Sequence, residues 1–388
     1  MLELRKDIFA DERDDNLKEI GKPTQRQDML GHVTATSTYF NDHKLQGMLH
    51  LKVLRSPHSH ARIRRIDLSE AERSSGVRRI IRGADVPRNL SLSLGQAFLH
   101  VPDAEKAMAT FKSILDEHAE PEELNSSAYS LAEAGVHLSE ALEYSKRAIS
   151  DLSSKTMDIS PDDAEPSDFA LMTALAANWD TLGWIKFRLG DFPAAEKYLE
   201  AAWQLMQASE VGEHLVEAYE KNGKKEKAAA VCNMARTTIA STDINHKLSE
   251  EMERLRPFLK APGGRLSHSS TVDGAMALSD MRTLKVPSPG KLTGNSGTAH
   301  FVISFLNSSR VENVVFLDGN EELRNGIASI AAAKFSQPAP DNTPVRIIRK
   351  ATLSCSIYTK ECFLVLMPIT DVATPVGFRM PVIPAPSN

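Results

Sequence analysis

The sequence predicts a multidomain α+β protein with a small α+β segment, an all-α array of helical hairpins and a small α/β C-terminal domain. Three observations predict this class. Apolar residues alternate at strand spacing around residues 50–81, and they recur at helical spacing across residues 95–260. In residues 298–370 the order of the runs is strand, strand, helix, strand, strand. A chain of 388 residues is long enough for two or three such domains.

The composition restricts the class of protein. Hydrophobic residues make up 41% and charged residues 25%, which is typical of globular proteins. The net charge of −5 indicates no nucleic-acid partner. We find no run of about 18 apolar residues, so no membrane span is predicted. The N-terminus is too charged for a secretory signal, and the default expectation for localisation is cytoplasmic.

The N-terminal part is read as a flexible arm, residues 1–19, followed by an α+β segment, residues 20–90. His50–Arg55 and Ala61–Ile66 alternate as half-buried strands do. The pattern then predicts a short helix, Glu70–Arg73, capped by Ser69, and a third strand, Val77–Ile81.

Three runs in this segment carry a family resemblance: IGKPTQRQDMLGHVT (20–34), GMLHLKVLRSPHSHARIRRID (47–67) and GVRRIIRGADVP (76–87). They resemble the a/b hammerhead domain of the aldehyde oxidase and xanthine dehydrogenase family. In that family the domain begins the molybdenum-cofactor-binding subunit, and the regions that hold the cofactor follow it. In this chain, a run with apolar residues at helical spacing follows Asn89 in place of those regions. The resemblance therefore implies ancestry for this piece, with no cofactor bound by this chain.

Two histidines in this segment, His58 and His60, stand two residues apart in a strand-turn pattern. Histidines so placed could ligate zinc. No carboxylate or cysteine pair accompanies them at ligand spacing, and the resemblance implies a structural turn. We therefore predict no metal site.

The central array, residues 95–260, is organised around Asn178–Trp203, which reads as two helices joined by a turn at Leu189-Gly190-Asp191. The pattern of large and small apolar residues resembles a tetratricopeptide (TPR) repeat. A second unit, Val211–Ala235, aligns with the first at an offset of 33 residues, so that Gly190 matches Gly223. The polar run Ser153–Ser167 is predicted to be a loop.

In stacked repeats of this kind the first helix of each pair lines a groove that binds peptides or proteins. Carried over by motif position, the predicted groove residues are Asp180, Trp184, Phe187, Arg188, Glu213, Glu217, Glu220 and Lys221. The competing interpretation is that Trp184 and Phe187 pack on a preceding helix, Asp168–Ala177. Lys186 departs from the motif, which usually has a packing aromatic residue there.

Residues 261–297 are rich in Gly, Ser, Pro and Thr and are predicted to be a linker. The element order of the following domain, 298–370, resembles the C-terminal domain of TonB proteins. Cys355 and Cys362 stand where a disulfide could close a hairpin. The amino-acid sequence from Gly95 to Pro368 also resembles exported bacterial repeat proteins. This resemblance implies an origin in the cell envelope for this part of the chain. Residues 371–388 are predicted to be a disordered tail.

No phosphate-binding, zinc-protease or nucleophile-elbow motif occurs in the sequence. The leading hypothesis is a non-catalytic scaffold whose repeat groove binds a peptide or protein. The alternative is a fragment or component of a molybdenum hydroxylase, an oxidoreductase of the xanthine dehydrogenase family, that needs a separate cofactor-binding chain. The third is a fused or truncated gene product without a joint function.

Overall fold

The computed structural model describes residues 52, 66–80, 88–101, 103–238, 242–259, 271–288, 297–306, 310–333, 339–356 and 361–369. The chain divides into two compact units, Met1–Ile80 and Ile81–Asn388. No helix in the described ranges is long and apolar enough to cross a membrane. Three predicted segments lie outside these ranges: the N-terminal arm, most of the hammerhead-like segment with His58 and His60, and the C-terminal tail.

The described part of the first unit contains one short helix, α2 (Ser69–Arg73). Its Ser69 is the first helical residue and does not cap the helix; instead its backbone N–H donates to the Asp67 carboxylate at 3.1 Å. Residues 77–80 form no strand, so the prediction of a strand over the described part of Val77–Ile81 is wrong. The run Val77-Arg78-Arg79 is exposed, and no neighbouring strand pairs with it within the described residues.

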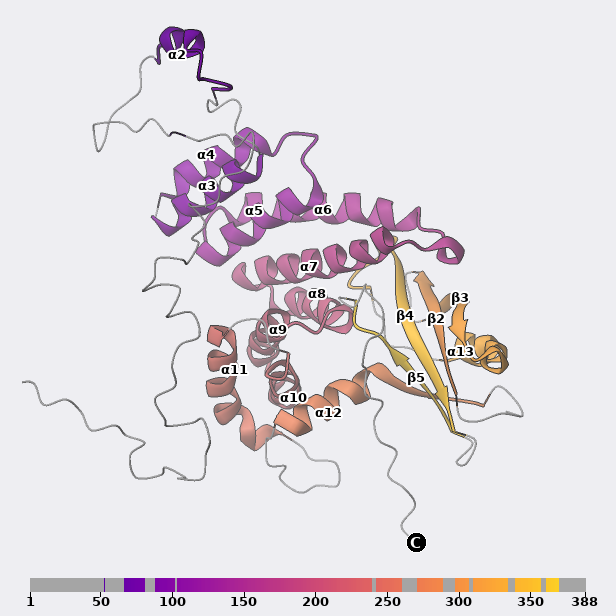
Figure 1. Ribbon diagram of the computed structural model, residues 1–388. Coiled ribbons are helices and arrows are strands. Elements are labelled where there is room, and N and C mark those ends of the chain that lie inside the picture. Colours follow the sequence, from indigo (N-terminus) through magenta and orange to yellow (C-terminus); the bar gives the residue numbers. More distant parts are fainter. Residues whose placement is uncertain are drawn as a thin grey trace, which may run out of the picture. The chain divides into compact units, whose positions relative to one another are not determined.

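The second unit begins with antiparallel helical hairpins (Figure 1). Each helix packs against its successor in the pairs α3/α4, α5/α6, α7/α8 and α9/α10, and α11 and α12 pack on the last pair. The helices are α3 (Arg88–His100), α4 (Ala104–Ile114), α5 (Pro121–Ala134), α6 (Leu138–Met157), α7 (Pro166–Arg188), α8 (Phe192–Leu205), α9 (Ser209–Lys221), α10 (Lys225–Ala235), α11 (Thr242–Leu255) and α12 (Thr271–Arg282).

Glycine sets the turns between the paired helices. Gly135, Gly190 and Gly223 follow α5, α7 and α9 with φ of 69°, 82° and 74°, the left-handed conformation that ends a helix at low cost. The turn predicted at 189–191 is therefore present, and Gly190 and Gly223 are equivalent as the 33-residue offset predicts. A Cβ on Gly183 would lie 2.7 Å from Leu199 Cγ, so glycine allows α7 and α8 to approach closely.

Two helices extend into segments predicted to be irregular. Helix α3 begins at Arg88, within the last residues of the segment 20–90 that was predicted to be hammerhead-like. Helix α6 continues to Met157, into the predicted loop Ser153–Ser167, because Leu152 and Thr156 are buried and extend its apolar face. Only a short 3₁₀ turn, η3 (Pro161–Asp163), separates α6 from α7.

The C-terminal part is a five-stranded antiparallel sheet of order β1-β5-β4-β2-β3. The predicted order strand, strand, helix, strand, strand is present, with the helix shortened to a 3₁₀ turn, η5, and one α-helix. The predicted linker differs from the structure, since its described part contains α12 and a strand that pairs with β5. The elements are β1 (Thr283–Val286), β2 (Gly297–Leu306), β3 (Val311–Gly319), η5 (Glu321–Gly326), α13 (Ile327–Ala331), β4 (Arg346–Cys355) and β5 (Cys362–Leu366).

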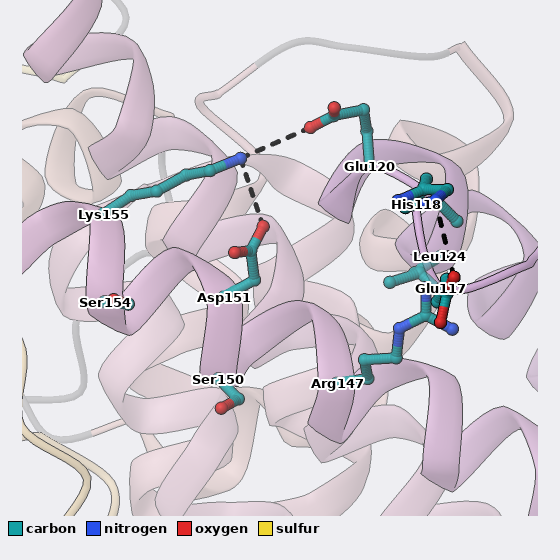
Figure 2. Close-up of a pocket in the computed structure, with 10 residues that line it drawn as sticks. Glu117, His118, Glu120, Leu124, Arg147, Ser150, Asp151, Ser154 and Lys155 are labelled. Atoms are coloured by element: carbon teal, nitrogen blue, oxygen red, sulfur yellow. Dashed lines mark hydrogen bonds and ion pairs between the residues drawn. The ribbon is translucent and has the colours of Figure 1, made fainter.

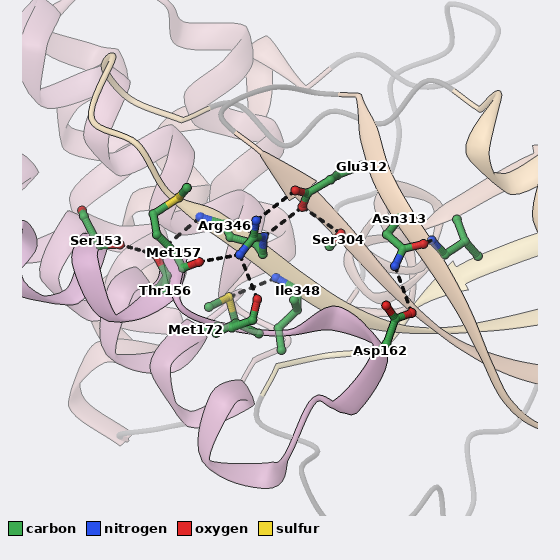
Figure 3. Close-up of polar contacts among 12 residues, drawn as sticks. Ser153, Thr156, Met157, Asp162, Met172, Ser304, Glu312, Asn313, Arg346 and Ile348 are labelled. Atoms are coloured by element: carbon green, nitrogen blue, oxygen red, sulfur yellow. Dashed lines mark hydrogen bonds and ion pairs between the residues drawn. The ribbon is translucent and has the colours of Figure 1, made fainter.

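Polar contacts join the sheet to the hairpins (Figure 3). Arg346 on β4 donates to the carbonyls of Met157 and Ile159 at 2.5 and 2.8 Å, and it pairs with the Glu312 carboxylate at 3.0 Å. The guanidinium thus satisfies the last carbonyl of α6 and one carbonyl just past its end. Buried apolar side chains form one cluster from α6 through β5. Array and sheet therefore share a core.

Cys355 and Cys362 face each other across the β4–β5 pair and form a disulfide. Both are buried, and the loop that they close is short, with a sequence separation of seven. The bridge stabilises the fold because it removes entropy from the unfolded chain, and a short loop removes less entropy than a long one. We therefore expect the double variant Cys355→Ser/Cys362→Ser to lose about 2 kcal/mol of unfolding free energy. Urea unfolding with and without reductant measures this loss. An unchanged midpoint on reduction would show that the bridge contributes nothing.

Candidate functional site

The predicted groove lies on the first helices of successive hairpins. Helix α7 packs against α5 and α9, and α9 packs against α11. Three side-chain contacts between neighbouring helices of this row join residues 34 positions apart, one more than the 33-residue offset of the helical units: Asp180–His214, Glu213–Lys247 and Glu220–Arg254. One of these contacts joins α7 to α9, and the other two join α9 to α11.

Trp184 is the central aromatic residue of this row and is 6% exposed. Its ring stacks on Phe187 at a centroid distance of 4.8 Å and on His214 of α9 at 4.2 Å. The indole N–H donates to the Glu133 carboxylate of α5 at 2.5 Å. Trp184 therefore links three helices of the array. The competing interpretation had Trp184 and Phe187 pack on a separate preceding helix, Asp168–Ala177. The structure has no such separate helix, because residues 166–188 form one continuous helix.

Asp180 and His214 form a buried pair between α7 and α9. The imidazole Nδ1 lies 3.0 and 3.2 Å from the two carboxylate oxygens of Asp180. Burial opposes the charged imidazolium, but Asp180, with Glu210 and Glu133 nearby, outweighs it and raises the pKa of His214 above its ordinary value of 6.5. The pair therefore favours a protonated histidine within the row.

The acids predicted on α9 face α11. Lys247 pairs with Glu213 and, at 3.1 Å, with Glu217. Arg254 binds Glu220 through both guanidinium nitrogens. Burial, with the neighbouring Glu251 charge, raises the pKa of Glu217. Through these ion pairs the carboxylates of α9 bind α11, the next helix of the row.

Exposure separates the predicted groove residues into three classes. Asp180, Trp184 and Glu213 are buried, and Phe187, Glu217 and Glu220 are partly buried. Arg188 and Lys221 are exposed at the C-terminal ends of α7 and α9. Arg188 donates to the Glu133 carbonyl at 3.3 Å, and Lys186, the departure from the motif, lies 3.4 Å from Asp191.

Sequence reasoning missed four residues that complete this cluster: Tyr129, Glu133, Glu210 and His214. Tyr129 donates a short hydrogen bond to Glu210, and Glu133 accepts from Trp184. The available signal was the repeat period. Adding 34 to Asp180 gives His214, whereas the 33-residue alignment used for the motif gives Glu213.

The surface also carries a hollow of about 600 Å³ beside α6, lined by the α4–α5 connection (Figure 2). Lys155 points toward both Glu120 and Asp151, at 3.3 and 3.1 Å. Arg147 donates to the Asp116 carbonyl. Three carboxylates, Glu117, Glu120 and Asp151, line this hollow with two cations, Arg147 and Lys155. A second hollow, of about 410 Å³, lies between α8 and α10, where Glu200 accepts from Tyr219 at 2.5 Å.

Across the described ranges, no group of three or more His, Cys, Asp or Glu side chains is placed to hold a metal ion. The residues present in these ranges therefore do not fit a metal-centred site. The predicted groove, with the Trp184 cluster at its centre, is the most developed constellation of polar and aromatic side chains that the structure describes.

Comparison with known proteins identifies one segment. Residues 34–118 match the family model "Aldehyde oxidase and xanthine dehydrogenase, a/b hammerhead domain". The chain is also 40% identical over 62 residues to the 6-hydroxypseudooxynicotine dehydrogenase complex subunit gamma of Paenarthrobacter nicotinovorans. That alignment covers 16% of this chain and 8% of the relative. No solved structure matches the chain.

The predicted hammerhead-like segment is thus confirmed, with a shift of its bounds. The family model begins at residue 34, later than the predicted residue 20, and ends at residue 118 rather than 90. It therefore extends across α3 and α4, which pack in the helical array. Residues 34–118 of this chain are similar to the hammerhead domain of the aldehyde oxidase and xanthine dehydrogenase family.

Proposed function

We propose that this chain is a non-catalytic component of a dehydrogenase of the aldehyde oxidase and xanthine dehydrogenase class, which joins a separate chain that binds the molybdenum cofactor. The observation that carries the proposal is the family match of residues 34–118. The name of the relative supports it, since that protein is a subunit of a dehydrogenase complex.

The described residues assign no chemical step to this chain. They contain no side-chain cluster suited to a metal ion, and the charged groups of the row pair with one another. In this proposal, cofactor binding and turnover belong to the partner chain. The function of this chain is then attachment, with the hairpins and sheet as a body held together by a common core.

A binding measurement tests the attachment. The full chain is immobilised and titrated with a cofactor-binding subunit of this enzyme class, and we expect saturable binding. Arg78 and Arg79 lie in the matched segment and are exposed. Reversing both charges, Arg78→Glu/Arg79→Glu, should weaken binding at least tenfold, because charge reversal at an interface edge costs about 1.4 kcal/mol or more.

The matched control reverses two exposed lysines outside the segment and outside the predicted groove, Lys146→Glu/Lys197→Glu. This variant should bind as the wild type does. Equal loss in both variants would indicate non-specific charge attraction, and absence of binding by the wild-type chain would refute the attachment.

A second function is favoured by the row of stacked helices α7, α9 and α11, which side-chain pairs join one to the next. Repeat arrays of this design bind peptides on the face of their first helices. The exposed cations Arg188 and Lys221 would bind an acidic peptide there. Arg188→Glu should abolish capture of such a peptide by the full chain, while Lys112→Glu on α4 should not. Equal capture by both variants would refute this function.

A further inference from the structure

A cluster of charged side chains joins α11 to α9. The α9–α11 contact consists of four carboxylates and two cations: Glu213, Glu217, Glu220, Lys247, Glu251 and Arg254. Lys247 pairs with Glu213 and, at 3.1 Å, with Glu217. Arg254 pairs in the same way with the other two carboxylates, one on each helix. Each cation therefore serves two carboxylates, and the fully ionised contact is negative.

The carboxylates of this contact are more deeply buried than its cations. The four carboxylate side chains are 11–25% exposed, whereas Lys247 and Arg254 are 49% and 56% exposed. Water screens the half-exposed cations and weakens the attraction that they supply. Carboxylates that share one cation in a covered site repel each other, and a proton taken up by one of them relieves that repulsion.

The groups that face Glu217 favour its protonated form. Burial raises the pKa of Glu217, and the charge of Glu251 on α11 raises it further. His214 of α9 acts in the opposite direction, while Glu133 of α5 and Glu220 again raise this pKa. Helices α5, α9 and α11 thus surround the carboxyl with mostly negative charge. It binds a proton more readily than an exposed glutamate does.

Glu251 is in a similar position on α11. Burial raises the pKa of Glu251 and is the largest effect on it. Arg254 and Lys247 oppose the rise, and the charge of Glu220 adds to it, so that the pKa lies above its ordinary value of 4.5. Two carboxyls on facing helices therefore hold a proton at a pH where exposed glutamates are ionised.

Apolar side chains and α10 fix the position of α11. Leu248 and Met252 are fully buried, and the Cys232 thiol of α10 donates to the Leu248 carbonyl at 3.2 Å. Burial raises the pKa of Cys232 to about 12, with Glu251 adding to the rise and Arg236 opposing it. The thiol therefore keeps its proton through neutral pH. Protonation at the α9–α11 contact thus acts on a helix whose apolar face is already packed.

The raised pKa values determine the direction of the pH effect. The contact binds a proton more tightly when α11 is packed than when it is released. Packing is therefore strengthened as the pH falls through the raised pKa values, and the gain is complete near pH 4.5. As the pH rises, both carboxyls ionise. His214, bound to Asp180 on α7, then also loses the positive charge that acts on Glu217.

We propose that the α9–α11 contact is a pH-sensitive switch: its carboxylates take up a proton as the pH falls and bind α11 tightly, and they release the helix as the pH rises. Opening uncovers Glu213, Glu217 and Glu220 on α9. These three carboxylates belong to the predicted groove, so the switch controls access to its acidic part. It lies within the array and does not depend on attachment to a cofactor-binding chain.

Hydrogen exchange of the full chain at pH 5 and pH 8 tests the switch, with each amide rate corrected for the intrinsic effect of pH. We expect residues 248–255 of α11 to lose protection at pH 8 by at least about threefold, a modest coupling for charged groups in contact. Amides of α6, which packs on α5 and α7, should lose less. No loss in α11, or an equal loss in both helices, would overturn the proposal.

Glu217→Gln separates the switch from a merely structural contact, because it removes the charge and keeps the shape of the side chain. Exchange of α11 at pH 8 should slow by at least about threefold, and exchange at pH 5 should stay close to that of the wild type. The matched control is Glu253→Gln, the same change at a 64% exposed side chain of α11, which should leave the pH response unchanged. Faster exchange of Glu217→Gln at pH 8, or an undiminished pH response in this variant, also overturns the proposal.

Discussion

Replacing Trp184 by alanine is expected to lower the free energy of unfolding by about 3–5 kcal/mol, the usual range for a large aromatic removed from a core. The ring stacks between Phe187 and His214, and its N–H binds Glu133. The substitution therefore leaves a cavity where the indole ring was packed. Contacts to α5, within α7 and to α9 are lost together.

Urea unfolding followed by circular dichroism measures the effect of Trp184→Ala. Leu189→Ala is the control, because Leu189 is 45% exposed at the α7–α8 turn, and it should change stability by no more than about 0.5 kcal/mol. A loss below about 1 kcal/mol for Trp184→Ala, combined with lost peptide capture, would mean that Trp184 acts as a binding anchor, contrary to this structure.

Replacing Asp180 by asparagine should have the second large effect, about 3 kcal/mol at pH 6, where a buried imidazolium loses its counter-ion. Asp180 is buried and binds His214 Nδ1 through both oxygens. The double variant Asp180→Asn/His214→Gln should recover part of the loss, since no unpaired charge then remains. If the double variant is less stable than Asp180→Asn, the ion pair is not the cause.

The same pair predicts how stability depends on pH. The pKa of His214 is raised above 6.5 in the folded protein, so the folded state binds the proton more tightly. Its contribution is complete below pH 6.5 and is lost as pH rises through the raised pKa. The gap between wild type and Asp180→Asn should therefore be widest near pH 6 and narrow above it. A gap that widens with rising pH would contradict the assignment.

Local patterns predicted the turns well because glycine conformation is a local property. Gly190 and Gly223 end α7 and α9 in the left-handed region as their alignment indicates. The hammerhead-like segment could also be predicted from the sequence, because the family resemblance depends on runs of matching residues. By contrast, the extension of α6 to Met157 depends on burial against later elements, which include Arg346 from β4. Such contacts are distant in sequence.

The groove was predicted less accurately because motif position gives a residue's place on a helix and not what covers it. Glu213 and Glu217 stand where the motif places a binding face, yet Lys247 of α11 pairs with both. The predicted linker was misread for a similar reason. Its short strand β1 carries little pattern of its own and is defined by pairing with β5. TPR-type peptide binding and the TonB likeness stay predictions.

The central claim is that this chain attaches to a chain that holds the molybdenum cofactor. Molybdenum and pterin analysis of the purified chain, alone and after co-purification with a cofactor-binding subunit, tests it most directly. We predict both in stoichiometric amount in the co-purified complex, and neither in the chain alone. Absence of molybdenum and pterin from both preparations, or their presence in the chain alone, would contradict the account.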